Sequence, residues 1–341
     1  MTRVLVTSIG GSPGIDVARC LRRDPSVHIV GADANAWGRQ LGQRLCDEVI
    51  PLPSARADAV AWLDAVVDAS RGVDFVFLGL DLEIEALAEA GTPLPVATAL
   101  APMHVLPLLV DKAKTERAAR SSGVLPRTVE FQGAAALDEV FAALAAPLWI
   151  RPAVGTSGTG SLKVATREQA AGWLAATTPG DSTRRWIAQE FLPGRNTNWS
   201  GVFVEGELVA SASMERLEYL LGAVAPSGIT GQVRLCETVL LSEVTEAALR
   251  VVHSLDPRPN GIYSVDLRED VHGRPKVTEV NPRLAGRPWL YAHAGVNLPL
   301  AAVRALRGLP VGDAVDVGGL RTGIQMYRQV DVDPLFGPRP K

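Results

Sequence analysis

The chain has 341 residues, of which 47% are hydrophobic and 21% are charged, and its formal net charge is −3. This composition is typical of a folded globular protein and excludes a chain that is disordered throughout. The length exceeds what one hydrophobic core usually supports, so we expect several domains with a site in a cleft between them.

The charge and the cysteine content indicate which classes of partner and which cellular compartment to expect. The 34 basic residues are spread along the chain, whereas nucleic-acid binding usually depends on clustered Lys and Arg, so we expect small-molecule partners and no nucleic acid. Cys20, Cys46 and Cys236 are odd in number and lack metal-ligand spacing, which favours a reduced cytoplasmic protein. No apolar run approaches the roughly 20 residues that span a bilayer, so we expect no membrane segment. Assembly into a homodimer is left open.

The first hundred residues alternate strand and helix patterns, which is typical of a parallel sheet. A loop is expected around Trp37. The predicted strands are 4–6, 27–32, 49–52 and 73–78, and the predicted helices are 15–23 and 57–70. We therefore assign residues 1–106 to a Rossmann-like domain.

A glycine turn follows the first predicted strand and partly resembles a dinucleotide-binding fingerprint. Gly10, Gly11 and Gly14 could approach a pyrophosphate, and Asp33 could bind a ribose hydroxyl. However, the spacing is not G-x-G-x-x-G, and Pro13 removes a backbone amide that a phosphate could use. A NAD-dependent oxidoreductase is therefore kept as an alternative function.

A second glycine-rich segment follows a predicted strand at 147–152. This strand ends near Arg151, and Gly155, Gly158 and Gly160 come directly after it. Exposed amides and small hydroxyls in such a loop can fold over a polyphosphate, although glycine and serine clusters also form ordinary turns. Further elements are predicted as helices 110–122 and 167–176, strands 162–164 and 186–191, and a hairpin of 199–204 with 208–210.

Oxygen ligands converge on a second predicted hairpin, formed by 263–268 and 277–283. Residues two apart on a strand face the same side, so Glu279 and Asn281 project together, with Asp266 across from them on the paired strand. Two carboxylates and an amide oxygen suit Mg²⁺, which fills its other positions with water and phosphate oxygens. Arg283 adds a planar cation for phosphate or carboxylate. A solvated polar face is the simpler alternative.

Together these motifs resemble the ATP-grasp superfamily, and most of all its carbamoyl-phosphate-synthetase-like and biotin-carboxylase-like branch. The resemblance covers nearly the whole chain. It rests on Lys112 after Asp111, the strand 150–152 with its glycine loop, the segment 189–194, Asp266, the run Glu279-Val280-Asn281-Pro282-Arg283, and Asp81-Leu82-Glu83 after the fourth predicted strand.

The resemblance implies an α/β (α+β) fold with a preATP-grasp domain at 1–106 and a two-lobed ATP-grasp domain. The small lobe would be 107–190 with the lid, the large lobe 191–325 with the metal site, and 326–341 a C-terminal tail. The implied reaction is phosphorylation of a carboxylate by ATP to an acyl phosphate, followed by attack of an amine, with release of ADP and phosphate.

The resemblance also implies a role for each motif residue. Lys112 and Arg151 would contact the ATP phosphates, Arg151 and Arg283 would act in phosphoryl transfer, and Asn196 stands where many members carry a ribose-binding glutamate. Asp266, Glu279 and Asn281 would hold one or two Mg²⁺, with Mn²⁺ as an alternative ion. The lid residues are Gly155, Thr156, Ser157, Gly158 and Gly160, and the adenine segment is Gln189, Glu190, Phe191 and Leu192, with the main chain of Glu190 and Leu192 contacting the base.

The substrates are expected to be a small carboxylic acid and an amine, with amino acids as the favoured class. The segment 214–234 and the loop after Arg283 would bound their site. A substrate carboxylate could pair with one of three arginines there, Arg216, Arg234 or Arg287. The same pocket could be lined by Trp289, Tyr291 and Asn297, or these three residues could pack a helix. A nucleotide-binding accessory protein without turnover is a further alternative.

Overall fold

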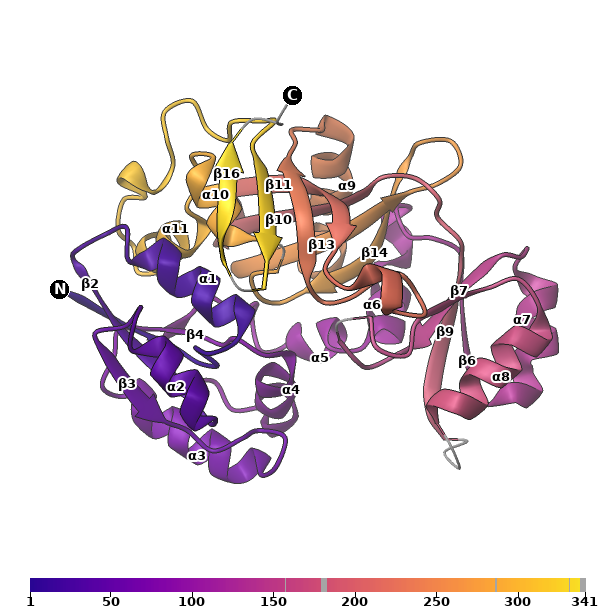
Figure 1. The fold of residues 1–341 in the computed structure, drawn as a ribbon, viewed down its shortest axis with the longest axis horizontal. Coiled ribbons are helices and arrows are strands. Elements are labelled where there is room, and N and C mark those ends of the chain that lie inside the picture. Colours follow the sequence, from indigo (N-terminus) through magenta and orange to yellow (C-terminus); the bar gives the residue numbers. More distant parts are fainter. Residues whose placement is uncertain (157, 179–182, 286, 331, 338–341) are drawn as a thin grey trace.

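A computed structural model describes residues 1–156, 158–178, 183–285, 287–330 and 332–337. Three sheets organise these residues into an N-terminal domain, a small lobe and a large lobe (Figure 1). In Figure 1 the N-terminal domain lies at the lower left, the small lobe at the right, and the large lobe above them. Within the described residues, no helix is long and apolar enough to cross a membrane.

The N-terminal domain is a parallel sheet with the strand order β3-β2-β1-β4-β5. Apolar side chains from both faces of the sheet, such as Leu5 and Ile29, are fully buried, as expected for a parallel sheet with helices on both faces. Its strands are β1 (Thr2–Val6), β2 (Val27–Asp33), β3 (Glu48–Pro51), β4 (Phe75–Phe77) and β5 (Ala97–Thr98), and its helices are α1 (Ser12–Leu21), α2 (Ala36–Gly42), α3 (Ala59–Ser70) and α4 (Asp81–Ala90).

The helix α2 replaces the loop that the sequence predicted around Trp37. The side chain of Asn35 accepts a hydrogen bond from the Trp37 amide over 2.9 Å and so caps the start of the helix. Gly38 lets the helix approach the glycine turn, because a Cβ on Gly10 would lie 2.3 Å from the Gly38 Cα. The prediction was wrong because this helix is short and is held by its cap and by close backbone packing, not by an apolar stripe.

The small lobe is an antiparallel sheet with the order β6-β9-β7-β8. Helices α7 (Leu137–Ala143) and α8 (Arg167–Thr177) cover one face, and their apolar side chains join Phe131, Ile150 and Trp186 in one core. The strands are β6 (Thr128–Gln132), β7 (Leu148–Pro152), β8 (Leu162–Val164) and β9 (Arg185–Glu190). This core is separate from those of the rest of the molecule.

The large lobe is an antiparallel sheet with the order β14-β13-β10-β11-β12-β15-β16. Its strands are β10 (Asn196–Val204), β11 (Glu207–Tyr219), β12 (Val233–Thr238), β13 (Gly261–Glu269), β14 (Pro275–Asn281), β15 (Gln325–Gln329) and β16 (Val332–Gly337). Helices α9 (Ser242–Leu255), α10 (Pro288–His293) and α11 (Leu298–Ala305) pack on it.

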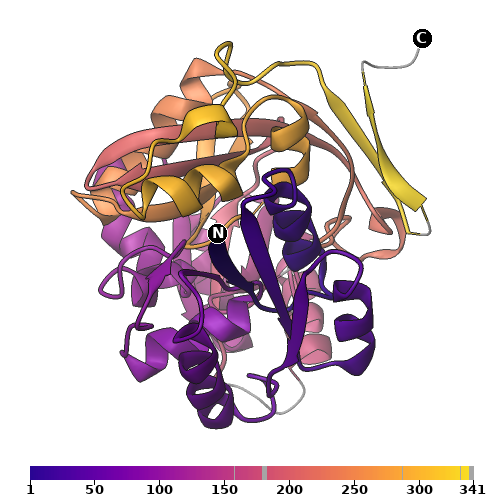
Figure 2. The ribbon, with the colours of Figure 1, turned by 90° about the vertical axis from the view of Figure 1, so that its left-hand side faces the viewer.

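Two predicted boundaries need correction. Residues 326–341 were predicted to be a tail, but β15 pairs with β12 and buries Met326, and β16 adds the edge strand seen beside it in Figure 2. A strand this short, with one buried residue, gives little signal in the sequence. The boundary at 106/107 falls inside α5 (Leu106–Leu109), which leads into α6 (Lys112–Ala119), and α6 packs against α9 of the large lobe.

The N-terminal domain and the large lobe are packed together through shared cores. One core contains Leu5 and Trp62 of the first with Trp199 and Val251 of the second. The small lobe contacts α6 through a cluster of three buried residues, Ala113, Ala153 and Ile187, and contacts the large lobe through Arg151, which bonds to Thr278 and faces Glu279. The molecule is therefore built as one large body and one separately packed lobe, with the glycine-rich loop 155–161 on the lobe that is less tightly joined.

Candidate active site

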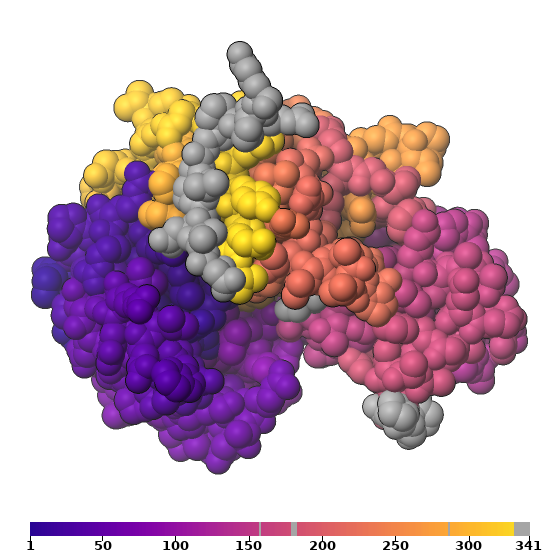
Figure 3. Space-filling view, viewed as in Figure 1, coloured from indigo at the N-terminus to yellow at the C-terminus, as the bar shows by residue number. Residues whose placement is uncertain are grey.

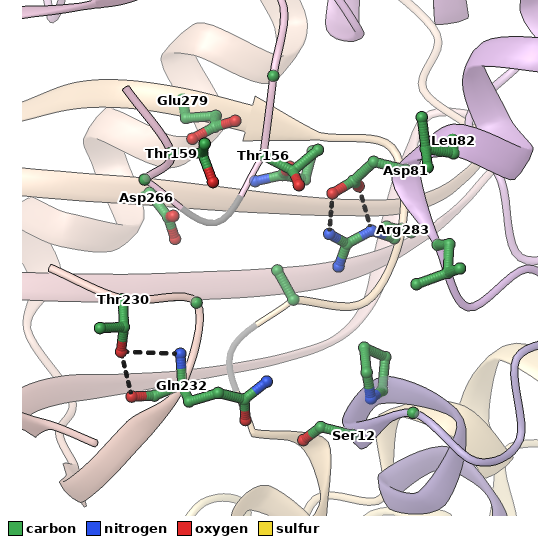
Figure 4. A pocket seen from close by; sticks show the side chains of 18 of the residues that line it. Ser12, Asp81, Leu82, Thr156, Thr159, Thr230, Gln232, Asp266, Glu279 and Arg283 are labelled. Carbon is green, nitrogen blue, oxygen red and sulfur yellow. Dashed lines mark hydrogen bonds and ion pairs between the residues drawn. The ribbon is translucent and has the colours of Figure 1, made fainter. Parts of the chain in front are cut away.

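A cavity of about 650 Å³ lies where the N-terminal domain and the two lobes meet. Figure 3 shows the surface hollowed between the N-terminal domain and the small lobe, and Figure 4 shows side chains that line the cavity. Residues from all three parts line it, including Ser12 and Asp81 of the N-terminal domain, Gln189 of the small lobe, and Asp266 and Glu279 of the large lobe. A cavity of this size is in the range that holds a small-molecule ligand.

The N-terminal domain turns the carboxyl ends of its strands toward this cavity. The segments that follow β1, β2, β3 and β4 all contribute lining residues. In open parallel sheets these ends form the crevice where ligands bind, at the point where the strand order reverses. Asp81, the first residue of α4, is placed there by Glu83, whose carboxylate accepts hydrogen bonds from Ser8 Oγ over 2.9 Å and from the Gly79 amide over 3.1 Å.

Glu279 is the point where two cations from different elements converge. Lys112 Nζ, at the first residue of α6, lies 3.1 Å from Glu279 Oε1, and Arg151 Nη1, in β7, lies 3.6 Å from Oε2. Burial lowers the pKa of Arg151, and the carboxylates of Glu279 and Asp266 offset part of that effect. The predicted neighbourhood of Lys112, Arg151 and Glu279 is therefore present in the structure.

Asp266 is held by polar groups of the large-lobe sheet. It pairs with Glu279 across β13 and β14, as the sequence predicted. Its Oδ1 accepts from Arg216 Nη2 over 2.6 Å and from Asn198 Nδ2 over 2.7 Å, whereas its Oδ2 has no hydrogen-bond partner within the described residues. Burial opposes the charge of Arg216, but the Asp266 carboxylate keeps the pKa of Arg216 above its ordinary value.

The oxygen donors at this end of the cavity fit a hard divalent cation. Asp266 and Glu279 are carboxylates, and the Asn281 side chain lines the same cavity without a hydrogen bond to any described residue. No group of three or more His, Cys, Asp or Glu side chains is placed for metal binding in the described part of the chain. Two carboxylates, an amide oxygen and phosphate oxygens are nevertheless the ligands that Mg²⁺ takes.

Arg283 lines the cavity but has a partner that the sequence did not indicate. Its guanidinium makes a two-bond ion pair with Asp81, in which Nη2 donates to Oδ2 over 2.7 Å (Figure 4). Burial would raise the pKa of Asp81, but the charge and hydrogen bonds of Arg283 lower it below its ordinary value. Arg283 thus joins the N-terminal domain to the hairpin of β13 and β14.

The glycine-rich loop borders the cavity through most of its predicted members. Gly155, Thr156 and Gly158 line the cavity, and the Gly155 carbonyl accepts a hydrogen bond from Lys112 Nζ over 2.6 Å. Gly160 does not line it. Glycine is needed at this position because its φ is +76° and because a Cβ there would lie 3.0 Å from Pro152 Cγ. Ser157 lies outside the described residues.

The predicted adenine segment lies along the cavity at the end of β9. Gln189, Glu190, Phe191 and Leu192 all line it. The Glu190 amide donates to the Arg127 carbonyl over 3.0 Å and is therefore already engaged, and the contact of the Glu190 and Leu192 main chain with a base stays a prediction. The Leu192 amide makes no backbone hydrogen bond to any described residue and so is the donor that remains available.

The remaining predicted site residues divide into two groups. Asn196, Arg216 and Arg287 line the cavity, and Asn196 donates to Tyr219 Oη over 2.9 Å. The other four make contacts elsewhere. Arg234 contacts Tyr327 on the surface, and Trp289 packs against His293. Tyr291 donates to Asn198 Oδ1, and Asn297 caps α11. The structure therefore excludes these four from the cavity lining.

The glycine turn after β1 serves packing more than ligand binding. Asp33 accepts hydrogen bonds from the amides of Gly10 over 2.9 Å and Asn35 over 2.8 Å, so its carboxylate is already engaged. Gly10 is in contact with Gly38, which leaves no room there for a pyrophosphate. These contacts argue against the dinucleotide site that the sequence suggested.

Comparison with known proteins agrees with this geometry. A family model described as the ATP-grasp domain matches residues 109–287, which is more than half of the chain. The chain belongs to the ATP-grasp family. No curated protein matches the chain in a sequence comparison.

Solved structures show the same ATP-grasp fold over 96% of this chain at low sequence identity. An L-amino acid ligase from Bacillus licheniformis has a TM-score of 0.68 at 16% identity, with 79% of that chain covered. An N5-carboxyaminoimidazole synthase from Aspergillus clavatus, in complex with ADP and its aminoimidazole ribonucleotide, has a TM-score of 0.69 at 16% identity, with 81% covered. A biotin carboxylase from Campylobacter jejuni has a TM-score of 0.67 at 15% identity, with 75% covered.

Several residues of this ATP-grasp cavity were not found from the sequence. Ser12 and Asp16 line the cavity, and Asn198 lies behind the lining, where it donates to Asp266. Ser12 contributes through contacts to distant residues, and Asp16 lies in α1 among apolar sequence neighbours. A signal existed only for Asp16, because a carboxylate on the buried face of a short helix is unusual.

Proposed function

We propose that this ATP-grasp protein is an ATP-dependent, ADP-forming ligase that joins a small carboxylic acid to an amine through an acyl phosphate. The observation that carries the proposal is the convergence of Lys112 and Arg151 on Glu279, beside Asp266 and Asn281, in one cavity. Carboxylate and amide ligands, phosphate-binding cations and a glycine-rich loop are the parts that phosphoryl transfer requires, because this chemistry depends mainly on alignment and charge neutralisation.

In the first step, a carboxylate oxygen of the acid forms a bond to the γ-phosphorus of ATP, and the bond from that phosphorus to the β–γ bridging oxygen breaks. ADP leaves with the electron pair of that bond. Lys112 and Arg151 neutralise charge on the phosphates, and Arg283 does so on the transferred group. Mg²⁺ held by Asp266, Glu279 and Asn281 would neutralise phosphate charge as well.

In the second step, the amine nitrogen attacks the carbonyl carbon of the acyl phosphate. The bond between this carbon and the phosphate oxygen breaks, inorganic phosphate leaves, and the nitrogen loses a proton as the amide forms. The small lobe, with its separate core and its glycine-rich loop, supports a closing motion that would exclude water from the acyl phosphate.

Small amino acids are the favoured substrate class within this proposal. One of the structural neighbours is described as an L-amino acid ligase, and the cavity is lined by Arg216, Arg268 and Arg287 in addition to the phosphate-binding cations. Arginine suits carboxylate recognition because its planar group donates two parallel hydrogen bonds. The protein acts in this proposal on small molecules, and assembly into a homodimer stays a prediction.

A substrate panel tests the proposal. Amino acids and small carboxylic acids are incubated singly and in pairs with ATP and Mg²⁺, and ADP is measured with mass detection of products. We expect one pair to release ADP and phosphate and to give a product lighter than the summed substrates by one water. Release of ADP that no added acid stimulates would instead support an accessory protein without turnover, and stabilisation by NAD in place of ATP would support an oxidoreductase.

A further inference from the structure

Two arginines from distant parts of the chain meet at the start of α1. Arg287 precedes α10, and Arg328 lies in β15. Nη1 of Arg287 donates to Ser12 Oγ over 2.7 Å, and Nη1 of Arg328 donates to the same oxygen over 3.1 Å. Both also donate to Gln232 Oε1, over 3.1 and 2.5 Å. Two cations therefore share two neutral acceptors.

The carboxylates described near Arg287 and Arg328 do not balance the positive charge of the two arginines. Asp16 Oδ2 lies 3.5 Å from Arg287 Nη1, and no carboxylate among the described residues forms an ion pair with Arg328. Burial raises the pKa of Asp16 in spite of these cations, which weakens the one compensating charge. Within the described part of the chain, the two arginines therefore face a single carboxylate, which leaves a surplus of positive charge beside the cavity.

Arg287 also has an unused donor. Its side chain is almost fully buried, at 5% exposure, and its Nε has no hydrogen-bond partner within the described residues. Buried polar atoms are nearly always paired, so a donor of this kind marks a place where a partner is missing. Arg287, Ser12 and Asp16 all line the cavity.

The start of α1 also favours a negatively charged ligand. This helix of ten residues begins after Gly11, which caps it with no side chain, and its first turn contains no acidic residue. The unpaired amides and the helix dipole at such an end favour an anion. The helix start and the arginine pair with its unpaired Nε are two independent features, and both point to a negatively charged ligand.

The site lies apart from the phosphate-binding end of the cavity. Figure 4 shows Ser12 and Gln232 on the opposite side of the view from Glu279, with Arg283 between them. The cations near Glu279 already have carboxylate partners: Lys112 lies 3.1 Å from Glu279, and Arg283 is paired with Asp81. The surplus at Arg287 and Arg328 is therefore not part of the predicted ATP site.

We propose that Arg287 and the start of α1 bind the carboxylate of an amino acid that serves as the amine donor. Arg328 does not line the cavity, but it donates to Ser12 and Gln232, which do, and adds its charge to that of Arg287. This inference rests on the proposed ligase function. The acid that is phosphorylated presents its carboxylate at the Glu279 end, so an anion bound at Ser12 is a group that the reaction leaves intact. The planar guanidinium of Arg287 suits a carboxylate, whose two oxygens can accept parallel hydrogen bonds.

A purely structural role for the same residues gives a different expectation. The arginine pair also ties α1 of the N-terminal domain to the large lobe, so its loss could lower stability without any effect on ligand choice. A test must therefore measure preference for a carboxylate and not activity alone. Arg328 is the better residue to change because it is only partly buried, whereas Arg287 is almost fully buried.

The experiment measures binding by calorimetry with the full chain, Mg²⁺ and a non-hydrolysable ATP analogue. The probes are the twenty L-amino acids, the α-carboxamide of each amino acid that binds, and inorganic phosphate. We expect at least one amino acid to bind wild type at least tenfold more tightly than its carboxamide. Arg328→Gln should reduce this preference to less than threefold, and Arg328→Lys should restore part of it. Arg234→Gln is the matched control, because Arg234 is also partly buried but donates to Tyr327 and makes no hydrogen bond to Ser12 or Gln232.

The inference is overturned if no amino acid binds better than its carboxamide, if Arg328→Gln keeps the full preference, or if phosphate competes more strongly than the amino acid. An Arg328→Gln protein that is only less thermally stable, with unchanged preference, would assign the arginine pair to domain packing. The measurement needs no turnover. A carboxylate preference that depends on Arg328, in a protein that forms no ADP with any substrate pair, would uphold this site and refute the ligase.

Discussion

Replacing Glu279 with glutamine is expected to lower kcat by about 10³-fold or more at saturating Mg²⁺. The carboxylate lies between Lys112 and Arg151, and the neutral amide removes both an oxygen ligand and the negative charge that aligns the two cations. Initial rates of ADP formation at increasing Mg²⁺ concentration, with the melting temperature measured in parallel, provide the test.

The control for Glu279→Gln is Glu243→Gln. Glu243 is also paired with an arginine, at 3.8 Å from Arg195, but it lies in the first turn of α9 outside the cavity. It should keep near-normal rates, because exposed ion pairs contribute little. Near-normal rates in a folded Glu279→Gln protein would refute the assignment of Glu279 to the metal and phosphate site.

Removing the Arg151 side chain is expected to cause the second large loss of activity. We expect Arg151→Ala to lower kcat/KM for ATP by about 10²-fold or more, because a buried cation next to the glycine-rich loop is removed. Arg151→Lys should stay within about tenfold of wild type, since an ammonium preserves the charge facing Glu279. Steady-state kinetics with ATP as the varied substrate gives both numbers.

Equal losses in the two Arg151 variants would show that the guanidinium shape itself is needed. The structure offers one reason for such a result, because Nη2 of Arg151 donates to the Thr278 carbonyl while Nη1 faces Glu279. An ammonium can replace only one of these contacts. Rates near wild type in Arg151→Ala would remove Arg151 from the site.

Sequence patterns located the parts of the site that depend on local spacing. The i, i+2 alternation placed Glu279 and Asn281 on one face, and hairpin pairing placed Asp266 opposite Glu279, as the register of β13 and β14 confirms. The strand predicted at 147–152 is β7 (Leu148–Pro152), and Gly155 and Gly158 after it line the cavity. These inferences needed only the geometry of a strand and its neighbour.

Such local patterns could not predict contacts between segments that are far apart in the sequence. The pairing of Arg283 with Asp81 joins residues 202 positions apart, and that of Arg328 with Ser12 joins residues 316 positions apart. Neither segment carries a local periodicity that identifies its partner. For the same reason, residues 326–341 were predicted to be a tail, although Arg328 reaches the start of α1 from β15.

The glycine turn after β1 shows a different reason why the sequence alone did not predict the structure. Gly10 and Asp33 match part of a dinucleotide-binding pattern, but Gly10 is needed for the approach of Gly38, and Asp33 accepts the amides of Gly10 and Asn35. A glycine that permits helix packing and a glycine that approaches a phosphate are identical in sequence. Only the position of α2 distinguishes the two.

Isotope transfer tests the acyl-phosphate mechanism most directly. The acid of the active pair is labelled with ¹⁸O in both carboxylate oxygens, and the reaction with ATP, Mg²⁺ and the amine is analysed by mass spectrometry of the released phosphate. Because the carboxylate oxygen bonded to the γ-phosphorus leaves with that phosphorus, we predict one ¹⁸O in each inorganic phosphate and one in each amide product. Phosphate without label, or label recovered in AMP, would contradict the account.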